Sequence, residues 1–317
     1  MPAASPSSLP LVSIITPSYN QAPFLEATLR SVLDQDYPEL EYLVVDGGSS
    51  DGSLEIIRAN ADRLAWWVSE PDAGQAEAIN KGVSRARGEI VAWLNSDDYY
   101  LPGTVRSAVR AMNAHPDAVL VYGNMQAVDA GGRIINMLRY PSVSLNDLLC
   151  FSIIGQPAVF IRRHALIAVG GLDPRFHLLL DHQLWIKLAA FGPIAHVDET
   201  WAAARSHPEA KNTAQARLFG PEAFQILKWA AEQPSLAPVL RNLGARAQAS
   251  AHRVNARYLL DAGMPAASVR AWLKVVSIHP RTALARLNIL GAAILELLGL
   301  GGIRRGALRR RMERFQR

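Results

Sequence analysis

Cysteine is nearly absent from this chain of 317 residues, because Cys150 is the only one. A lone cysteine excludes an intrachain disulfide, which fits the reducing conditions of the cytoplasm. The eight histidines are scattered, and their spacing does not suggest a zinc site. Met1 to Pro10 lacks the basic start and the apolar core of a signal peptide. We therefore expect a cytoplasmic protein with a disordered N-terminal tail over residues 1–10.

One apolar stretch near the C-terminal end of the sequence falls short of a membrane-spanning helix. Leu287 to Ile303 is apolar except for Asn288 and Glu296, so it is short for a span and contains a charge. Six of the seven arginines that follow this stretch form a cluster: Arg304, Arg305, Arg309, Arg310, Arg311 and Arg314. We expect either an amphipathic helix on an anionic membrane surface, where each arginine is worth about 1 kcal/mol, or a packed terminal helix with a solvated basic end. The first alternative places the protein peripherally on the inner face of the membrane.

The net charge of +5 is concentrated in the last part of the chain. From Arg270 onward, eleven Lys and Arg stand against Glu296 and Glu313, a surplus of nine positive charges. The rest of the chain is therefore net negative. This balance argues against nucleic-acid binding by the main domain.

Three predicted strands run into acidic residues. Short apolar runs without polar alternation are typical of parallel strands that are covered on both faces. Ligands of open α/β sheets collect at the carboxyl ends of such strands. A helix N-cap or an Asx turn is the alternative role for these acids. The three strand ends are Glu41–Val45 before Asp46, Leu64–Val68 before Asp72, and Ile90–Leu94 before Asn95-Ser96-Asp97-Asp98.

Helical segments alternate with these strands. A first strand at Leu11–Thr16 is followed by apolar residues at helical spacing behind Pro23, a residue favoured in the first helical turn. Ser53 to Leu64 and Gly74 to Arg87 read as further helices, the latter with Gly88 as a left-handed C-terminal cap. Strands and helices in this alternation predict an α/β fold with a mostly parallel, Rossmann-like sheet.

The turn after the first strand argues against two classes of nucleotide enzyme. Pro17-Ser18-Tyr19-Asn20 stands where a sugar nucleotidyltransferase would have a glycine-rich, basic phosphate loop. Gln21-Ala22-Pro23-Phe24 does not match the glycine fingerprint of a dinucleotide oxidoreductase.

The order of these motifs resembles that of family 2 glycosyltransferases with the GT-A fold. The resemblance extends over roughly two hundred residues, and it is the order and spacing of the motifs that make it specific. Its first half rests on Val12–Asn20, Tyr42–Ser53, Asp72–Gln75, Asn80–Gly82 and Gly88–Asp98, and its second half on Gly170–Phe176 and Asp181–Leu188.

The resemblance implies a nucleotide-sugar donor, carrying UDP, dTDP or GDP. Asp46 then accepts hydrogen bonds from the base or the ribose, and Pro17, Tyr19 and Asn20 form a rigid turn below the base. Asp72 matches a second position near the base, with Gln75 beside it. Arg205 and His207 are candidates for the loop that closes over the diphosphate.

The resemblance also implies a divalent cation, Mn²⁺ or Mg²⁺, at the end of the strand that precedes Asn95. The family motif has an acid where this chain has Asn95, so the site loses one negative charge, and Asn95 and Ser96 are left to contact the donor. We expect Asp97 to be the main metal ligand and Asp98 the next. Because cation affinity follows ligand charge, the site should be weakened but retained.

Asp181 corresponds to the family's general base. In that role it removes the proton of the acceptor hydroxyl as the oxygen attacks the anomeric carbon, so that one displacement inverts the configuration. Proton removal typically contributes about 10²–10⁴-fold to the rate. The structural alternative is an N-cap, because Asp181 lies where a helix begins. The acid that usually precedes the base is replaced by Leu180.

We thus expect three regions: a tail at 1–10, a GT-A domain at 11–220 and a helical extension at 221–317. The domain divides into a nucleotide-binding half at 11–100 and an acceptor-binding half at 101–220. Within the extension, Asn255 to Pro280 resembles one tetratricopeptide-type helix pair with Gly263 at its turn. The resemblance implies transfer to a glycan or lipid-linked acceptor in surface polysaccharide or glycolipid assembly. The alternatives are a non-catalytic nucleotide-sugar binding protein and a helical-repeat scaffold.

Overall fold

The computed structural model describes residues 9–302 and 306, so the predicted arginine cluster and most of the predicted N-terminal tail lie outside the described residues. By packing, the chain divides into two compact units. Parts of the predicted acceptor-binding half, residues 101–220, belong to the same unit as the C-terminal helices. The predicted boundaries at residues 100 and 220 stay predictions. The sheet unit takes Met1–Met125, Gly155–Pro174 and Phe191–Ala204, and the helical unit takes Gln126–Ile154, Arg175–Ala190 and Arg205–Arg317.

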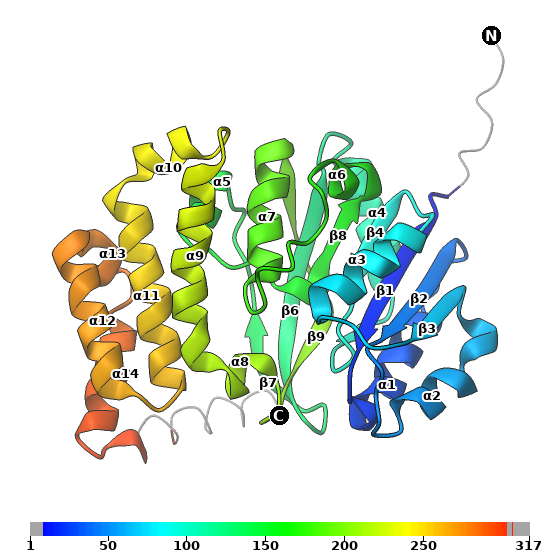
Figure 1. The fold of residues 1–317 in the computed structure, drawn as a ribbon, viewed down its shortest axis with the longest axis horizontal. Coiled ribbons are helices and arrows are strands. Elements are labelled where there is room, and N and C mark those ends of the chain that lie inside the picture. The colour runs from blue at the N-terminus through cyan, green and yellow to red at the C-terminus, as the bar shows by residue number, and fades with distance from the viewer. Residues whose placement is uncertain (1–8, 303–305, 307–317) are drawn as a thin grey trace, which may run out of the picture. The chain divides into compact units, whose positions relative to one another are not determined.

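The strands are β1 (Val12–Ser18), β2 (Leu40–Asp46), β3 (Trp66–Ser69), β4 (Ile90–Trp93), β5 (Tyr99–Tyr100), β6 (Leu120–Asp129), β7 (Ile134–Leu138), β8 (Val159–Arg162) and β9 (Ile194–Ser206). They form one sheet in the order β3-β2-β1-β4-β8-β6-β9-β5, with β7 paired to β6 (Figure 1). β1 pairs in parallel with β2 and β4, and β2 pairs in parallel with β3. β8 is antiparallel to β4 and β6, and β5 is antiparallel to β9. The parallel arrangement predicted from the apolar runs thus holds through β4, and the sheet as a whole is mixed.

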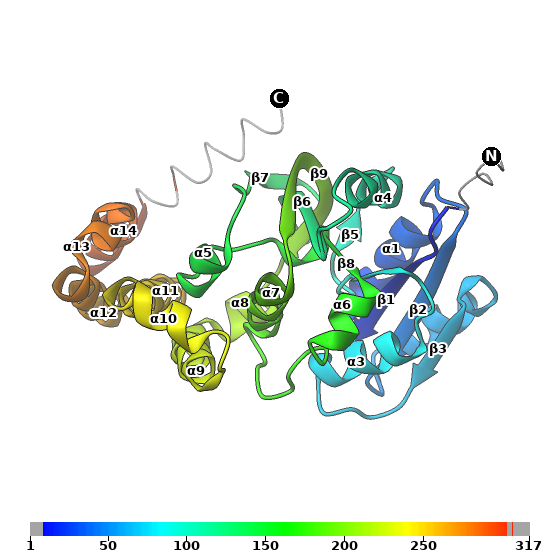
Figure 2. The same ribbon diagram turned by 90° about the horizontal axis from the view of Figure 1, so that it is seen from above.

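Helices cover both faces of the parallel strands. The helices of the sheet unit are α1 (Ala22–Leu33), α2 (Ser53–Ala59), α3 (Gln75–Arg85), α4 (Thr104–Ala114) and α6 (Arg163–Ala168). Successive side chains of a strand point to opposite faces. Ile14 therefore joins a buried cluster with residues of α1, α2 and α4, whereas Ile15 lies against Gly82 of α3. Figure 2 shows α1 and α3 on opposite sides of β1. The predicted α/β architecture is confirmed.

Gly88 is needed for close packing and not for a left-handed cap. α3 ends at Arg85, and Gly88 is not among the residues with positive φ. A Cβ atom at Gly88 would lie 2.6 Å from the backbone nitrogen of Ser13 and 2.8 Å from the carbonyl oxygen of Leu11. The prediction of a C-terminal cap was therefore wrong. The glycine allows the segment before β4 to approach the start of β1.

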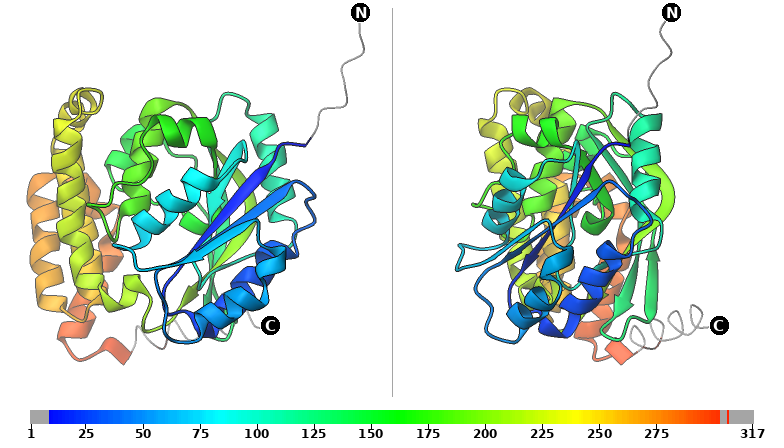
Figure 3. Two further views of the ribbon diagram at one scale, coloured as in Figure 1. Left: turned by 45° about the vertical axis from the view of Figure 1, so that its right-hand side comes forward. Right: turned by 90° about the vertical axis from the view of Figure 1, so that its right-hand side faces the viewer.

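The helical unit stacks antiparallel helices in a row. Its helices are α5 (Leu145–Leu149), α7 (Leu180–Phe191), α8 (Lys211–Ala214), α9 (Phe219–Glu232), α10 (Ala237–Leu243), α11 (Ala245–Asp261), α12 (Pro265–Ile278), α13 (Pro280–Leu284) and α14 (Leu287–Leu297). Figure 3 shows α9, α11 and α12 side by side. The predicted helix pair is α11 and α12, and Gly263 in their turn has φ +71°. Trp272, Val275, Ile289 and Ala293 pack in one buried cluster, which ties α14 to α12. Over residues 9–302, the helices are all too short or too polar to cross a bilayer.

Candidate active site

Asp46 is fully buried at the carboxyl edge of the parallel strands, where it ends β2. Its carboxylate accepts hydrogen bonds from the backbone N–H groups of Gly48 (3.2 Å) and Ser49 (2.9 Å). It also accepts from the hydroxyls of Ser49 (2.5 Å) and Ser69 (2.7 Å). These four bonds hold the loop after β2 against the end of β3. Contact between Asp46 and a donor stays a prediction, and the structure adds a loop-ordering role that the sequence did not signal.

The loop after β1 is bound to the loop after β2. The N–H of Asn20 donates to Ser49 Oγ at 2.8 Å, and the N–H of Ser50 donates to Asn20 Oδ1 at 2.9 Å. Asn20 has φ 51°, a left-handed conformation that asparagine adopts more readily than most residues. Pro17 lies within β1, and Tyr19 is 63% exposed. Tyr19 and Asn20 therefore form a fixed turn with an accessible ring, whereas Pro17 precedes this turn in β1. Stacking of a base on the Tyr19 ring stays a prediction.

Asp72 lies against the same loop. Its Oδ1 accepts the N–H of Gly74 at 2.8 Å, and its Oδ2 would lie 3.0 Å from a Cβ atom at Gly47. The absence of a side chain at Gly47 thus lets the Asp72 carboxylate reach the loop that Asp46 orders. The two acids predicted near the base, Asp46 and Asp72, are brought to one place in the sheet unit.

Asn95 joins Gln75 to the acidic turn after β4. Gln75 Nε2 donates to Asn95 Oδ1 at 2.7 Å, and Asn95 Nδ2 donates to Asp98 Oδ2 at 3.5 Å. A carboxylate at position 95 could accept from Gln75 but could not donate to Asp98. The amide that replaces the family's acid therefore links α3 to the predicted metal ligands without adding charge.

The turn that carries Asp97 and Asp98 is anchored to α1. The N–H of Asp98 donates to the carbonyl oxygen of Asn95 at 3.0 Å, which closes the turn. Thr28 Oγ1 lies 2.9 Å from the carbonyl oxygen of Ser96 and 2.7 Å from that of Asp98. Ser96 and Asp98 are buried, while Asp97 keeps more exposed surface. This difference in access favours Asp97 as the first ligand of an incoming cation.

A cation at this turn would need ligands from outside the protein. Over the described part of the chain, no cluster of three or more His, Cys, Asp or Glu side chains could hold a metal ion. Mg²⁺ and similar hard cations are commonly bound by one or two carboxylates together with water and substrate phosphates. Two neighbouring carboxylates on an anchored turn fit that pattern. They do not fit a permanently bound structural metal.

Asp181 lies in the first turn of α7, within the helical unit. The helix begins at Leu180, so Asp181 is inside the helix and the N-cap alternative does not hold. Asp181 Oδ1 accepts the N–H of His182 at 2.7 Å. Burial of the carboxyl raises the pKa of Asp181 to about 6, and the negative charge of Glu222 adds to this effect. The positive charge of Lys211 and the hydrogen bond from His182 act in the opposite direction. A carboxyl with a pKa near 6 is ionised at neutral pH and is a stronger base than an ordinary aspartate.

Glu222, on α9, holds the segment just before this turn. Its buried carboxylate accepts the N–H groups of His177 (2.7 Å) and Leu178 (2.7 Å), and also that of Leu179. Three backbone donors next to the start of α7 are thereby satisfied by one side chain. Glu222 lies more than forty residues away in the sequence, and no local pattern pointed to it.

His182, which follows the proposed base, and the candidates Arg205 and His207 have structural partners. His182 Nε2 bonds the carbonyl oxygen of Leu148 at 2.9 Å, and its ring stacks on Phe151. Burial lowers the pKa of His182 to about 4, so the ring is neutral and serves the packing of α7. Arg205 donates to the carbonyl oxygen of Ala130 at 3.1 Å, and His207 is buried. A role for Arg205 or His207 at a diphosphate stays a prediction.

Comparison with known sequences finds one family along the first half of the chain. Residues 13–166 match the model of glycosyl transferase family 2. A putative teichuronic acid biosynthesis glycosyltransferase of Bacillus subtilis, TuaG, is 32% identical over 192 residues, which cover 59% of this chain and 75% of TuaG. The chain spans about a third or less of the length of several other curated relatives.

Solved structures resemble nearly the whole chain. The S. aureus TarS fragment 1–349 in complex with UDP-GlcNAc has a TM-score of 0.58 at 18% identity and covers 92% of this chain and 89% of its own. A mannosyltransferase from Pyrobaculum calidifontis in complex with GDP-Man and Mn²⁺ has a TM-score of 0.60 at 22% identity, with 94% and 89% covered. These likenesses establish the fold as GT-A, including the helices that follow the sheet.

Proposed function

Because the chain belongs to glycosyltransferase family 2, we propose that it transfers a sugar from a nucleotide-sugar donor to a hydroxyl group of a glycan or lipid-linked acceptor. The observation that carries this proposal is the gathering of Asn20, Asp46, Asp72 and the Asn95–Asp98 turn at the carboxyl ends of β1 to β4. Each group has a fixed position, and together with the exposed ring of Tyr19 they offer polar side chains and carboxylates. A base, a ribose and a cation-bound diphosphate need these three kinds of partner.

The donor is proposed as a UDP-, dTDP- or GDP-sugar, bound with Mn²⁺ or Mg²⁺. Two structural neighbours are complexes with UDP-GlcNAc and with GDP-Man and Mn²⁺, which supports both parts of this proposal. Asp97 and then Asp98 would hold the cation. When bound, a divalent cation offsets the charge that develops on the departing diphosphate.

Asp181 is proposed as the general base of a single inverting displacement. Its carboxylate takes the proton of the acceptor hydroxyl while that oxygen forms a bond to the anomeric carbon. The bond from that carbon to the diphosphate oxygen breaks, and its electron pair leaves with the nucleoside diphosphate. Because Asp181 is held in the first turn of α7 and is already ionised at neutral pH, it needs no activation by another base.

A screen of donor hydrolysis tests the function directly. With the full chain, one of the UDP-, dTDP- or GDP-sugars is expected to release its nucleoside diphosphate slowly in the presence of Mn²⁺. Chelation of the metal should reduce this release by about tenfold or more, because the cation then no longer offsets the charge on the departing diphosphate. Binding of a nucleotide sugar without turnover, with any acceptor or none, would favour a non-catalytic binding protein. Absence of both binding and release would overturn the proposal.

The named role of TuaG in teichuronic acid biosynthesis supports a proposed part in surface polysaccharide or glycolipid assembly, at the cytoplasmic face of the membrane. Peripheral attachment is supported by α14. Ile289 and Ala293 pack in the core of the helical unit, whereas Leu287, Leu297 and Leu298 are exposed. α14 therefore packs on α12 and also exposes apolar side chains, which supports the membrane alternative as a proposal.

Replacing Leu297 and Leu298 together with Glu should abolish co-sedimentation with vesicles that contain acidic lipid. The matched control is Leu273→Glu, because Leu273 is an exposed leucine on α12. Binding of the parent should weaken with salt, as the Debye length falls from about 10 Å at 0.1 M to about 3 Å at 1 M. A parent protein that ignores such vesicles at low salt would exclude membrane attachment.

A further inference from the structure

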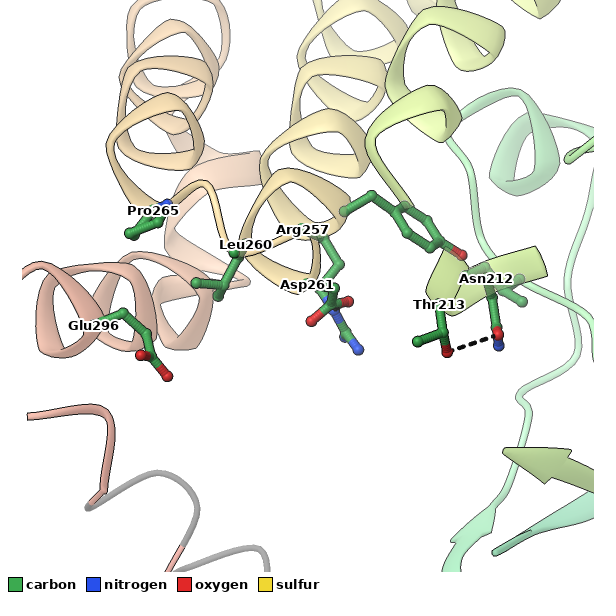
Figure 4. Close-up of a pocket in the computed structure, with 10 residues that line it drawn as sticks. Asn212, Thr213, Arg257, Leu260, Asp261, Pro265 and Glu296 are labelled. Atoms are coloured by element: carbon green, nitrogen blue, oxygen red, sulfur yellow. Dashed lines mark hydrogen bonds and ion pairs between the residues drawn. The ribbon is translucent and has the colours of Figure 1, made fainter. Parts of the chain in front are cut away.

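The helical unit contains a cleft whose lining residues have no assigned part in the proposed transfer reaction. Its volume is about 860 Å³, within the range of small-molecule binding sites. The wall is formed by the α5–β8 loop at Ile153, by α8 at Asn212 and Thr213, by α11 and its turn, and by Glu296 of α14. In Figure 4, Asn212 and Thr213 of α8 lie across the opening from Arg257 and Asp261 of α11.

Among the described residues, the lining combines polar groups with apolar surface and has no cluster of cations. Asn212 and Thr213 offer an amide and a hydroxyl, both able to donate and to accept. Ile153, a 57% exposed isoleucine, adds an apolar surface. Arg257 is the only cation among the lining residues that the structure describes, and its charge is paired with Asp261 at 2.6 Å. This set suits a neutral molecule with many hydroxyl groups, and it suits a phosphate poorly.

Tyr258 gives the cleft a rigid aromatic wall. Its ring stacks on Phe219 with centroids 4.0 Å apart and planes 9° apart. Burial raises the pKa of Tyr258 to about 12, so the phenol keeps its proton at physiological pH and remains a hydrogen-bond donor. A ring held in one position with a polar tip is well suited to contact a sugar.

Two elements connect the cleft to Asp181. On α8, Lys211 acts electrostatically on Asp181, while the next two residues, Asn212 and Thr213, line the cleft. On α11, Tyr258 lines the cleft and is itself affected by the charge of Asp181. The cleft therefore shares α8 and α11 with two side chains that interact electrostatically with the proposed base.

We propose that this cleft binds neutral sugar residues of the acceptor glycan, beyond the residue whose hydroxyl is deprotonated. The proposal rests on the proposed transferase function for the identity of the ligand. It assigns the helical unit a role in acceptor selection, because its α8, α11 and α14 form most of the wall.

The test is binding of neutral oligosaccharides to the full chain, without donor. We would screen oligosaccharides of two to four hexose or N-acetylhexosamine units by saturation-transfer NMR and then titrate those that bind. Thr213→Trp fills the cleft and is expected to weaken binding by about tenfold or more. Asn212→Ala removes one hydrogen-bonding group and is expected to weaken it by about fivefold.

Two matched controls lie outside the cleft: Ser277→Trp on α12 and Asn242→Ala on α10, both at exposed positions. Each should bind like the parent. Thermal unfolding checks that Thr213→Trp is folded, and Asn212→Ala carries the test if it is not. Equal affinity of parent, Asn212→Ala and folded Thr213→Trp would overturn the proposal, as would the absence of any binding in the screen.

The screen of donor hydrolysis separates this inference from the proposed function. Donor hydrolysis with no oligosaccharide binding would leave the transferase intact and remove the acceptor cleft. Oligosaccharide binding that is lost in Thr213→Trp, in a protein that neither binds nor hydrolyses any donor, would leave a glycan-binding cleft and remove the transferase.

Discussion

Replacing Asp181 with Asn is expected to lower the rate of sugar transfer by about 10²–10⁴-fold while donor affinity stays within about twofold of the parent. The amide keeps the size of the side chain and can still accept the hydrogen bond from His182. It cannot take a proton from the acceptor hydroxyl. Donor affinity is measured by calorimetry and transfer by single-turnover kinetics, so that binding and chemistry are separated.

The pH dependence of transfer provides an independent test of the same residue. Because the pKa of Asp181 is raised to about 6, the base becomes protonated as the pH falls through 6, and transfer should be lost below that pH. A base with the ordinary aspartate pKa would lose activity only near pH 4. The small residual rate of Asp181→Asn should lack this acidic limb.

Glu222→Gln should move the acidic limb to lower pH. The substitution removes a negative charge that raises the pKa of Asp181, so the base stays ionised in more acidic solution. Glu232→Gln, at an exposed position on the same helix, is the matched control and should leave the limb in place. Near-parental transfer by Asp181→Asn would show that the base lies elsewhere. A limb that does not respond to Glu222→Gln would show that Glu222 does not raise the pKa of Asp181.

The parts of the fold that could be predicted are those that local patterns determine. Residues 42–45 of β2 and 90–93 of β4 are apolar without alternation, which is typical of buried parallel strands. β1 also contains Ser13 and Thr16, and all of its residues are buried. Pro23 lies in the first turn of α1, where its missing N–H costs nothing. The strand ends at Asp46 and at Asn95–Asp98 were predicted correctly. The point where an apolar run stops marks the end of the strand, and that end lies at the edge of a parallel sheet.

The parts that could not be predicted depend on contacts between distant segments. Glu222 caps the segment before α7 only because α9 packs beside it. Asp46 carries the pattern of a ligand-binding acid, but Ser49 and Ser69 occupy its oxygens. Gly88 has the position of a helix cap, yet glycine is needed there because a side chain would clash with the backbone at the start of β1. In each case the chemistry of the residue was visible in the sequence and its partner was not.

Replacing Asp97 or Asp98 with Ala should weaken binding of the nucleoside diphosphate by about 10–100-fold in Mn²⁺ and much less in chelator. A carboxylate that holds a cation contributes to nucleotide affinity only through that cation. The effect should be larger for Asp97, which is more accessible than the buried Asp98. Because Asp98 also accepts from Asn95, Asp98→Asn is measured beside Asp98→Ala.

Asp46→Ala and Thr28→Val should reduce nucleotide affinity whether or not metal is present, in contrast to Asp97→Ala and Asp98→Ala. Asp46→Ala removes the acceptor of four internal hydrogen bonds, so the loop after β2 should loosen and nucleotide affinity should fall with or without metal. Thr28→Val frees the acidic turn from α1 without changing its charge, and its loss of affinity should also persist in chelator. Calorimetric titrations in Mn²⁺ and in chelator distinguish the two patterns. Equal losses under both conditions for Asp97→Ala and Asp98→Ala would mean that these carboxylates support the turn and do not bind the metal.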